Sequence, residues 1–351
     1  MRNAEQRSWM TVVIATYNSA RFLPGLANML ERQMKPPESG SLEVLIVDGG
    51  SSDETRTLAI EMGFRVIDNP EGNAIAAKNI GIRNASARLV CILDHDESLV
   101  RNDSLLRRFE AFESDPNLRA IISAGYEFLP GESAANMYAS EFGDPVSLAT
   151  YRCPNNARFR LSLLRNRLVE VSRKGEMHLF SAGSEQRPIL CEMAAGSGTI
   201  DVDFFRDNHP QVLDDKNALP HAYYYLGNGD RIGVLERDSI LHSSAENWSV
   251  VRSKISWRVR NAVLNTGVSQ SGFSGRSHSD LYSPRSHALR FSLYALTILP
   301  PLCDALSLAF SRRRVGYLNH FLLTYYVVWS AAWFRLSRLL GRAVNEARYG
   351  E

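Results

Sequence analysis

The chain has few cysteines and no spacing that would place them in a metal or redox site. Cys91, Cys153, Cys191 and Cys303 are scattered over 351 residues, and no two of them form a Cys-x-x-Cys pair. This distribution disfavours a zinc site and a disulfide framework. It is typical of reduced, buried thiols in a cytoplasmic protein.

Several other signals are also missing. The net charge is only +2, and no basic segment alternates with aromatic residues, so the sequence gives no sign of nucleic-acid binding. Neither a GxGxxG after the first expected strand nor a GxxxxGK[ST] occurs, which argues against a dinucleotide enzyme and a P-loop ATPase. The apolar run at residues 10–14 is too short for a signal peptide.

What is present is a globular composition with a regular alternation of strands and helices. Hydrophobic residues make up 44% of the chain and charged residues 22%. Apolar β-branched runs alternate with segments of helical periodicity, which predicts βαβ units and an α/β fold with a mostly parallel sheet flanked by helices. The expected strands are residues 10–15, 42–47, 64–67, 88–93 and 118–128, and the expected helices follow Ser19, Ser51 (with Glu54 as a capping box), Asn73 and Asp103.

Polar side chains follow several of these strands at the point where each strand ends. The run LVCIL at residues 89–93 predicts a strand buried on both faces, and Asp94, His95 and Asp96 come directly after it. Asp48 ends the second strand in the same way. Open α/β sheets bind ligands at the carboxyl ends of their strands, so we expect these groups to meet in one nucleotide-sized crevice.

Four short motifs in this half occur in an order that resembles one enzyme family. They are VIATYN at residues 13–18, VDGGSSDET at 47–55, AKNIGI at 77–82 and LDHD at 93–96. Together they resemble the opening of the family 2 glycosyltransferases. The resemblance implies a GT-A fold, an α/β sheet that binds a nucleoside-diphosphate sugar and usually a divalent cation.

The resemblance also implies roles for the donor-binding residues. Asp48 would hydrogen-bond the nucleobase, in a pocket lined by Thr16 and Tyr17 with Asn18 in the same motif. Asp94 would face the ribose and the sugar. Lys78 stands where the family often has arginine and would contact a phosphate or the donor sugar.

A metal site and a catalytic base follow from the same resemblance. Asp96, with Asp94 and His242, would hold Mn²⁺ or Mg²⁺ against the diphosphate, and carboxylates are ligands that both ions prefer. The base that takes the proton from the acceptor hydroxyl would be Asp215, or else Asp214. The sequence departs from the common family pattern twice, with Gly49 where a second aspartate is frequent and His95 inside the Asp-x-Asp triplet. These departures leave open the identity of the donor's nucleobase and sugar.

The last part of the chain changes in composition. Residues 266–287 contain seven serines and three glycines and are expected to form a linker or mobile loop. Two apolar runs follow, at residues 288–310 and 318–334, with arginines before, between and after them and Pro300-Pro301 inside the first. This pattern favours helices that lie in a membrane interface or re-enter by one face over spanning helices. The alternative is that these faces are buried within the protein or in a homo-oligomer.

The sequence as a whole predicts a metal-dependent inverting glycosyltransferase at the cytoplasmic face of the cell membrane. Its acceptor would be a glycan or a lipid-linked compound, a polyprenyl phosphate or a polyprenyl-diphosphate oligosaccharide of surface-polysaccharide assembly. The expected domains are a nucleotide-sugar half (1–130), an acceptor half (131–265), the linker (266–287) and a membrane-association region (288–351). The alternatives are a nucleotidyltransferase of related topology and a catalytically silent membrane scaffold with the same fold.

Overall fold

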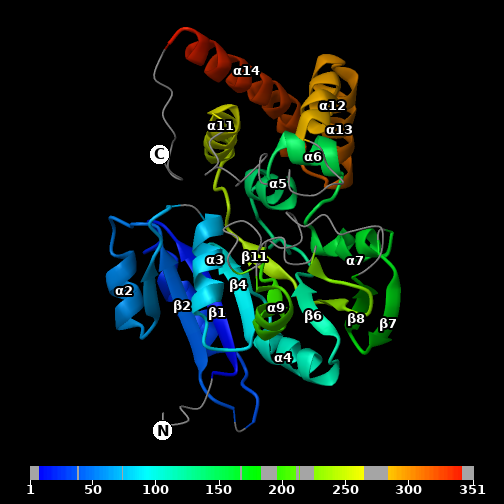
Figure 1. Ribbon diagram of the computed structural model, residues 1–351. Helices are drawn as coiled ribbons and strands as arrows, with labels where there is room; N and C mark the ends of the chain where they lie inside the picture. The colour runs from blue at the N-terminus through cyan, green and yellow to red at the C-terminus, as the bar shows by residue number, and fades with distance from the viewer. Residues whose placement is uncertain are drawn as a thin grey trace. The chain divides into compact units, whose positions relative to one another are not determined.

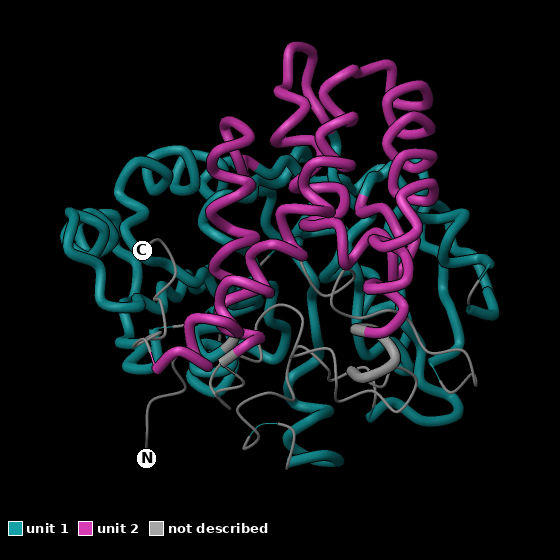
Figure 2. Tube along the Cα trace, turned by 90° about the horizontal axis from the view of Figure 1, so that it is seen from above, with its two compact units in different colours: residues 1–127, 156–242 teal, residues 128–155, 243–351 magenta. Residues whose placement is uncertain are grey.

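The computed structural model describes residues 8–37, 39–72, 74–166, 168–182, 196–210, 213, 225–264 and 284–341. The chain divides into two compact units, coloured teal and magenta in Figure 2. Unit 1 comprises residues 1–127 and 156–242, and unit 2 comprises residues 128–155 and 243–351. The chain passes from unit 1 into unit 2 at residue 128, returns to unit 1 at residue 156 and enters unit 2 again at residue 243.

Unit 1 is built on a mixed sheet, nine-stranded in the described part of the chain, with the order β3-β2-β1-β4-β9-β6-β10-β8-β7 (Figure 1). Strands β3, β2, β1 and β4 are parallel, β6 is parallel to β10, and β9, β8 and β7 pair antiparallel. A two-stranded sheet pairs β5 with β11. The strands are β1 Met10–Thr16, β2 Leu42–Asp48, β3 Arg65–Asp68, β4 Leu89–Asp94, β5 Glu97–Leu99, β6 Leu118–Ile122, β7 Glu170–Lys174, β8 Met177–Ser181, β9 Thr199–Asp201, β10 Arg231–Leu235 and β11 Ile240–His242. The predicted α/β class is confirmed.

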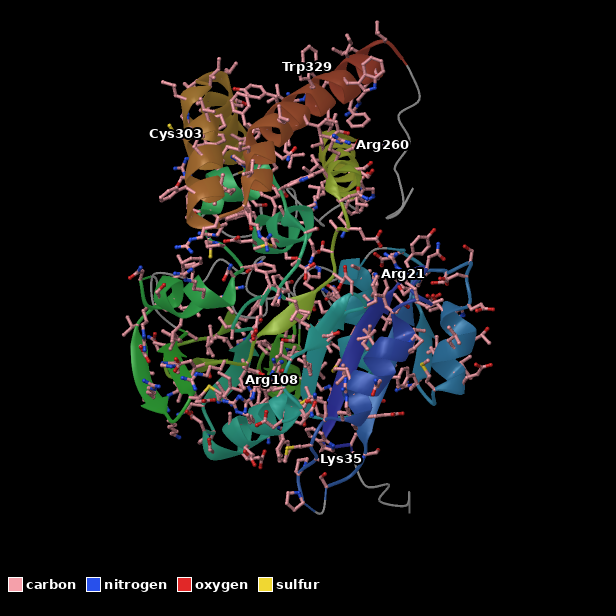
Figure 3. All side chains as sticks on the ribbon, turned by 180° about the vertical axis from the view of Figure 1, so that it is seen from behind. Arg21, Lys35, Arg108, Arg260, Cys303 and Trp329 are labelled. Carbon is pink, nitrogen blue, oxygen red and sulfur yellow. The ribbon has the colours of Figure 1, made fainter. Side chains whose placement is uncertain are left out.

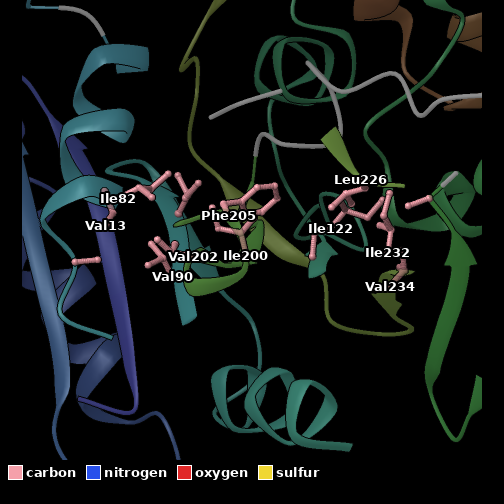
Figure 4. Close-up of a cluster of buried hydrophobic side chains, with 14 of the residues drawn as sticks. Val13, Ile82, Val90, Ile122, Ile200, Val202, Phe205, Leu226, Ile232 and Val234 are labelled. Atoms are coloured by element: carbon pink, nitrogen blue, oxygen red, sulfur yellow. The ribbon is translucent and has the colours of Figure 1, made fainter. Parts of the chain in front are cut away.

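Helices cover this sheet and close its core. Helix α3 packs on β1 and β2, α9 on β4 and α4 on β6. The helices of unit 1 are α1 Leu23–Glu31, α2 Thr55–Glu61, α3 Ala74–Asn84, α4 Ser104–Ser114, α7 Ala157–Arg165 and α9 Val202–Asn208. Figure 4 shows the apolar layer that runs along the sheet from Val13 and Val90 through Ile200 to Ile232. The burial of this layer is the main stabilising term for unit 1.

One glycine sets how closely α3 approaches the sheet. A Cβ atom at Gly81 would lie 2.2 Å from Cγ1 of Val13 on β1, which is far inside van der Waals contact. The helix can lie this close only because residue 81 has no side chain. The position of α3, and of Lys78 one turn earlier on it, therefore depends on this contact.

Two local expectations were wrong in detail. The capping box of Ser51 and Glu54 does not form: Glu54 is the N-cap of α2 without a side-chain bond. Asp53 instead accepts hydrogen bonds from the backbone N–H and hydroxyl of Thr55, and Ser51 donates its hydroxyl to Asp48. The strand expected at residues 118–128 ends at Ile122, since the following residues leave the sheet and only Tyr126 makes isolated bridges.

Unit 2 is helical. Its elements are α5 Ala134–Phe142, α6 Pro145–Tyr151, α11 Trp248–Leu264, α12 Pro284–Leu296, α13 Leu299–Ser311, the 3₁₀ helix η3 Val315–Leu318 and α14 Asn319–Leu339. Its core contains Tyr138, Phe291, Tyr317 and Leu323. Among the described helices none alone has the length and apolarity to cross a bilayer, but the bent pair Leu289–Leu296 and Leu299–Ser311 passes that test together, with an angle of 82°.

Candidate active site

The sheet places the predicted donor-binding residues together at the carboxyl ends of its parallel strands. Thr16 pairs in register with Asp48, and Ala15 pairs with Asp94, so β1, β2 and β4 end side by side. This arrangement follows from the parallel pairing of the three strands. The crevice expected from the sequence thus has its framework at the carboxyl ends of these strands.

Asp48 organises the turn that follows β2. Its buried carboxylate accepts hydrogen bonds from the Thr16 hydroxyl at 3.1 Å, from the backbone N–H groups of Gly50 and Ser51 at 3.2 and 3.0 Å, and from the Ser51 hydroxyl at 2.5 Å. Arg56 lies 3.4 Å from the same carboxylate. A carboxylate has two acceptor oxygens, and these donors share them. The turn at residues 49–51 is therefore fixed before any ligand binds.

Asn18 joins this turn to the loop after β1. Its side-chain oxygen accepts hydrogen bonds from the backbone N–H and the hydroxyl of Ser52, at 2.9 and 3.3 Å, and its own N–H donates to Ser51 at 2.8 Å. The residue is exposed and has φ +48°, a conformation that asparagine tolerates better than most residues. Tyr17, in the same loop, is half-buried. The two loops thus form one rigid rim along the edge of the sheet.

Lys78 and Asp94 form an ion pair at the end of β4. Lys78 Nζ lies 2.8 Å from Oδ1 and 3.0 Å from Oδ2 of Asp94. Burial would lower the pKa of Lys78, but the charges of Asp94, Glu97 and Asp96 outweigh it and raise that pKa above its ordinary value. The ammonium group therefore stays charged, and it lies among three carboxylates.

Asp96 and His242 form a second pair beside the first. His242 Nε2 lies 3.4 Å from Oδ2 of Asp96, and both side chains are largely buried. The His242 ring stacks on Tyr126, with centroids 4.6 Å apart. The structure thus brings two of the three predicted metal ligands together, while Asp94 is engaged by Lys78. Over the ranges that the structure describes, no three His, Cys, Asp or Glu side chains converge closely enough to hold an ion by themselves.

Glu97 is a site residue that the sequence reasoning missed. Its buried carboxylate accepts hydrogen bonds from the Tyr126 hydroxyl at 2.8 Å and from the backbone N–H of Asp94 at 3.0 Å. Burial and the nearby charge of Asp94 raise the pKa of Glu97 to about 7. Glu97 therefore links the turn after β4 to the segment after β6. Its position directly after the Asp-His-Asp triplet, as an acid opening a strand, was the available signal.

Arg108 anchors the small-residue segment before β9. This fully buried arginine, labelled in Figure 3, pairs with Asp238 at 2.8 Å and donates to the backbone oxygen and the hydroxyl of Ser197. It also lies 3.2 Å from the Thr199 hydroxyl. Since a buried guanidinium needs acceptors for its donors, this network holds the segment against β4 and α4.

The remaining predicted residues fall elsewhere. His95 does not face the carboxylates: its Nδ1 lies 3.3 Å from the Ala15 backbone oxygen and its ring packs on Phe22. The predicted base residues Asp214 and Asp215 lie outside the described residues. Their assignment therefore stays a prediction.

Residues 11–157 match the family described as Glycosyl transferase family 2. This part of the chain is therefore similar to the family 2 glycosyltransferases. It contains Thr16, Asp48, Lys78, Asp94 and Asp96, so the match and the site geometry concern the same residues.

Curated glycosyltransferases match part of the chain. An uncharacterized glycosyltransferase of Rickettsia prowazekii is 25% identical over 127 residues, which is 35% of this chain and 38% of that protein. A PGL/p-HBAD biosynthesis glycosyltransferase of Mycobacterium tuberculosis is 34% identical over 104 residues, 28% of this chain and 39% of that protein. Glycosyltransferase AglE of Haloferax volcanii is 30% identical over 94 residues, 25% of this chain and 30% of that protein. The chain thus matches less than half the length of these relatives.

Solved structures resemble the chain over more of its length at low identity. The mannosyltransferase PcManGT from Pyrobaculum calidifontis, in complex with GDP-Man and Mn²⁺, is 15% identical, with a TM-score of 0.48 and coverage of 97% of this chain and 89% of that one. S. aureus TarS in complex with UDP is 14% identical, with a TM-score of 0.43 and coverage of 96% and 93%. No residue role follows from likenesses at this level.

Proposed function

We propose that this chain transfers a sugar, with inversion, from a nucleoside-diphosphate sugar to an acceptor hydroxyl. One observation carries the proposal. The pairs Lys78–Asp94 and Asp96–His242 lie together at the carboxyl end of β4, at the same end of the sheet as Asp48. All of these residues except His242 belong to the segment that matches the family 2 glycosyltransferases. An ammonium group beside carboxylates is the set of charges that a metal-bridged diphosphate needs.

The nucleoside side of the donor would lie along the edge formed by β1 and β2. Asp48, Thr16 and the neighbouring Tyr17 and Asn18 belong to two loops that hydrogen bonds already hold together. A preformed rim reduces the entropy that must be lost on binding. We assign the nucleobase to this rim, with Asp48 as the group that fixes its shape.

A divalent cation, Mn²⁺ or Mg²⁺, fits the donors at the second pair. A carboxylate from Asp96 and an imidazole from His242 suit Mn²⁺, and the carboxylate alone suits Mg²⁺. Two protein donors suffice, because such ions usually take their other ligands from substrate phosphates and water. When bound, the ion would stabilise the negative charge that develops on the leaving diphosphate. Lys78 would add a fixed positive charge on the same side.

The acceptor half of the proposal rests on the sequence. Asp215, or else Asp214, would take the proton from the acceptor hydroxyl as it attacks the anomeric carbon. The apolar and basic composition of unit 2 supports an acceptor presented at the cytoplasmic face of a membrane, a lipid-linked sugar or phosphate.

The test compares Asp96→Ala with Asp207→Ala, an exposed aspartate of α9 that serves as the matched control. With each nucleoside-diphosphate sugar and Mn²⁺ or Mg²⁺, donor hydrolysis and transfer are measured. We expect Asp96→Ala to lose at least about a hundredfold in rate, in line with the loss of one group that stabilises developing charge. Equal rates in wild type and Asp96→Ala would refute the metal assignment. Donor binding without turnover in the wild type would favour the silent scaffold.

A further inference from the structure

Three helices of unit 2 carry an exposed apolar stripe in addition to the face that they bury. The exposed residues are Leu289, Leu293 and Leu296 on α12, Leu299, Leu302, Leu306 and Phe310 on α13, and Leu322, Trp329, Trp333, Leu336 and, just past its end, Leu340 on α14. Their spacing of three, four and seven residues places each set on one side of its helix. A surface helix of a soluble domain normally needs only one such stripe, the one that faces the core.

Helix α14 shows the two stripes most clearly. Its residues His320, Leu323 and Val327 are buried in the core of unit 2. Trp329, labelled in Figure 3, is 72% exposed and lies on the opposite side of the helix by its spacing from that set. The exposed stripe is therefore separate from the residues of α14 that pack into the core of unit 2. Exposed apolar areas of this extent mark interaction surfaces.

The turn between α12 and α13 extends this surface. Leu296 is 75% exposed and Leu299 is 68% exposed, and Ile298 between them is also exposed. Ile298 has φ +59°, a conformation that β-branched residues rarely adopt, and the two helix segments meet there at 82°. The pair therefore forms a corner and not a hairpin. A corner suits two helices that lie flat in one plane better than a segment that enters and leaves a bilayer.

The charges around these stripes are almost all positive. Residues 284–341 contain seven arginines and one acid, Asp304. Asp304 is engaged by Arg152 at 2.6 Å and by the Tyr294 hydroxyl at 2.6 Å. Arg313 and Arg314, at the end of α13, are exposed. An apolar face with this rim would repel a second copy of itself and would attract an anionic surface.

We infer that α12, α13 and α14 form a surface that lies on an anionic lipid bilayer. The leucines, Phe310 and the tryptophans would enter the boundary between headgroups and acyl chains, and Arg313 and Arg314 would contact the headgroup phosphates. This inference rests on the membrane-face part of the proposed function and not on sugar transfer. It selects flat, interfacial binding over spanning or re-entrant helices.

Flotation of the full chain with vesicles tests the inference. Vesicles of phosphatidylcholine alone are compared with equimolar phosphatidylcholine and phosphatidylglycerol. We expect binding to the anionic vesicles only, weakened by salt, at least about tenfold weaker for Phe310→Asp and roughly thirtyfold weaker for Arg313→Gln combined with Arg314→Gln. Ile60→Asp, at another exposed apolar position, on α2 (62% exposed, against 88% for Phe310), is the control and should bind like the wild type.

A label on Cys303 gives a second readout. This cysteine is exposed on α13, next to Leu302, whereas Cys91 and Cys153 are buried. An environment-sensitive fluorophore on Cys303, in a Cys191→Ser background, should shift to the blue with anionic vesicles, and a Cys303→Ser chain should show no labelled signal. No shift, or Phe310→Asp floating like the wild type, would overturn the inference.

Light scattering distinguishes self-association of the chain through this surface from binding of the surface to a lipid bilayer. A dimer that Phe310→Asp dissociates and that vesicles do not displace would overturn the inference in favour of self-association. The vesicle assay contains no donor sugar, so loss of transferase activity cannot mimic its failure. Transfer to a soluble acceptor that persists without vesicle binding would remove only this inference.

Discussion

Lys78 Nζ contacts both carboxylate oxygens of Asp94, at 2.8 and 3.0 Å. The contact joins α3 to the end of β4 and largely neutralises one of the two aspartates of the Asp-His-Asp triplet. Asp96 is left to interact with His242. Asp94 and Asp96, which are separated only by His95, therefore have different environments, and we expect them to have different roles.

Lys78→Met should lower both stability and donor affinity. Removal of one partner from a partly buried ion pair leaves the Asp94 charge uncompensated, at a cost of roughly 1–3 kcal/mol. Lys78→Arg should retain most of the binding, because a guanidinium can contact both carboxylate oxygens. Urea unfolding and donor titration measure the two effects. Adding Asp94→Asn to Lys78→Met should restore part of the lost stability, and a double variant no more stable than Lys78→Met would contradict the pairing.

Asp48→Asn tests whether the turn after β2 is preorganised. The amide has one acceptor oxygen where the carboxylate has two, so an NH₂ group would face some of the donors from Thr16, Gly50 and Ser51. We expect a loss of about 2–3 kcal/mol in the free energy of unfolding. Ser51→Ala removes one donor to Asp48 and the acceptor of the Asn18 backbone N–H, and should cost about 1–2 kcal/mol. If Asp48→Asn were as stable as the wild type in thermal unfolding, the network would have no structural role.

The parts of the fold with local sequence signals could be predicted, and the rest depended on distant contacts. The buried runs of β1 and β4 and the helical period of α3 gave the parallel half of the sheet almost to the residue. Strands β9 and β10 pair across long separations: β9 is antiparallel to β4 and β6, and β10 is antiparallel to β8 and parallel to β6. No local period reveals such pairings.

The placement of several candidate site residues at one end of the sheet could be predicted for a similar reason. Asp48, Lys78, Asp94 and Asp96 stand in short motifs, and the parallel register places three of them on one edge. Glu97 was missed because its role comes from Tyr126, 29 residues away, and Arg108 because its partners Asp238 and Ser197 are 130 and 89 residues away. In the sequence alone, an acidic residue next to a strand end, such as Glu97, cannot be told from a turn residue until its distant partner is known.

Gly81→Ala should destabilise the protein although alanine favours helix. The new Cβ would overlap Cγ1 of Val13, and such overpacking typically costs 1–3 kcal/mol. Combining it with Val13→Ala should recover part of that loss, since the clashing methyl group is removed. A double-mutant cycle in urea measures the coupling. Additive effects of the two substitutions would show that α3 does not rest on β1 through this contact.

His320 makes the stability of the chain depend on pH. Its Nδ1 lies 2.8 Å from the Tyr138 hydroxyl and its Nε2 lies 2.7 Å from the Tyr294 hydroxyl. Burial lowers the pKa of His320 to about 4, from an ordinary 6.5. Between these values the unfolded chain binds the extra proton, so stability rises with pH over this window and is lost as pH falls through it.

The size of this effect is about 3 kcal/mol between pH 6.5 and 4. His320→Gln offers a neutral acceptor and donor in place of the ring and should flatten the unfolding free energy over this range. Tyr138→Phe leaves the histidine in place and should keep the slope. Unfolding curves at several pH values measure both, and an unchanged slope in His320→Gln would assign the pH dependence to other groups.

The most direct test of the proposed donor site is calorimetry of UDP and GDP binding with and without Mn²⁺. The proposal predicts that one nucleoside diphosphate binds the wild type much more tightly with Mn²⁺, and that Asp96→Ala loses this gain while keeping weak, metal-independent binding through the rim of Asp48 and Thr16. Asp207→Ala, at an exposed position of α9, should bind like the wild type. Mn²⁺-dependent binding that is the same in Asp96→Ala as in the wild type would contradict the assignment of the metal to Asp96.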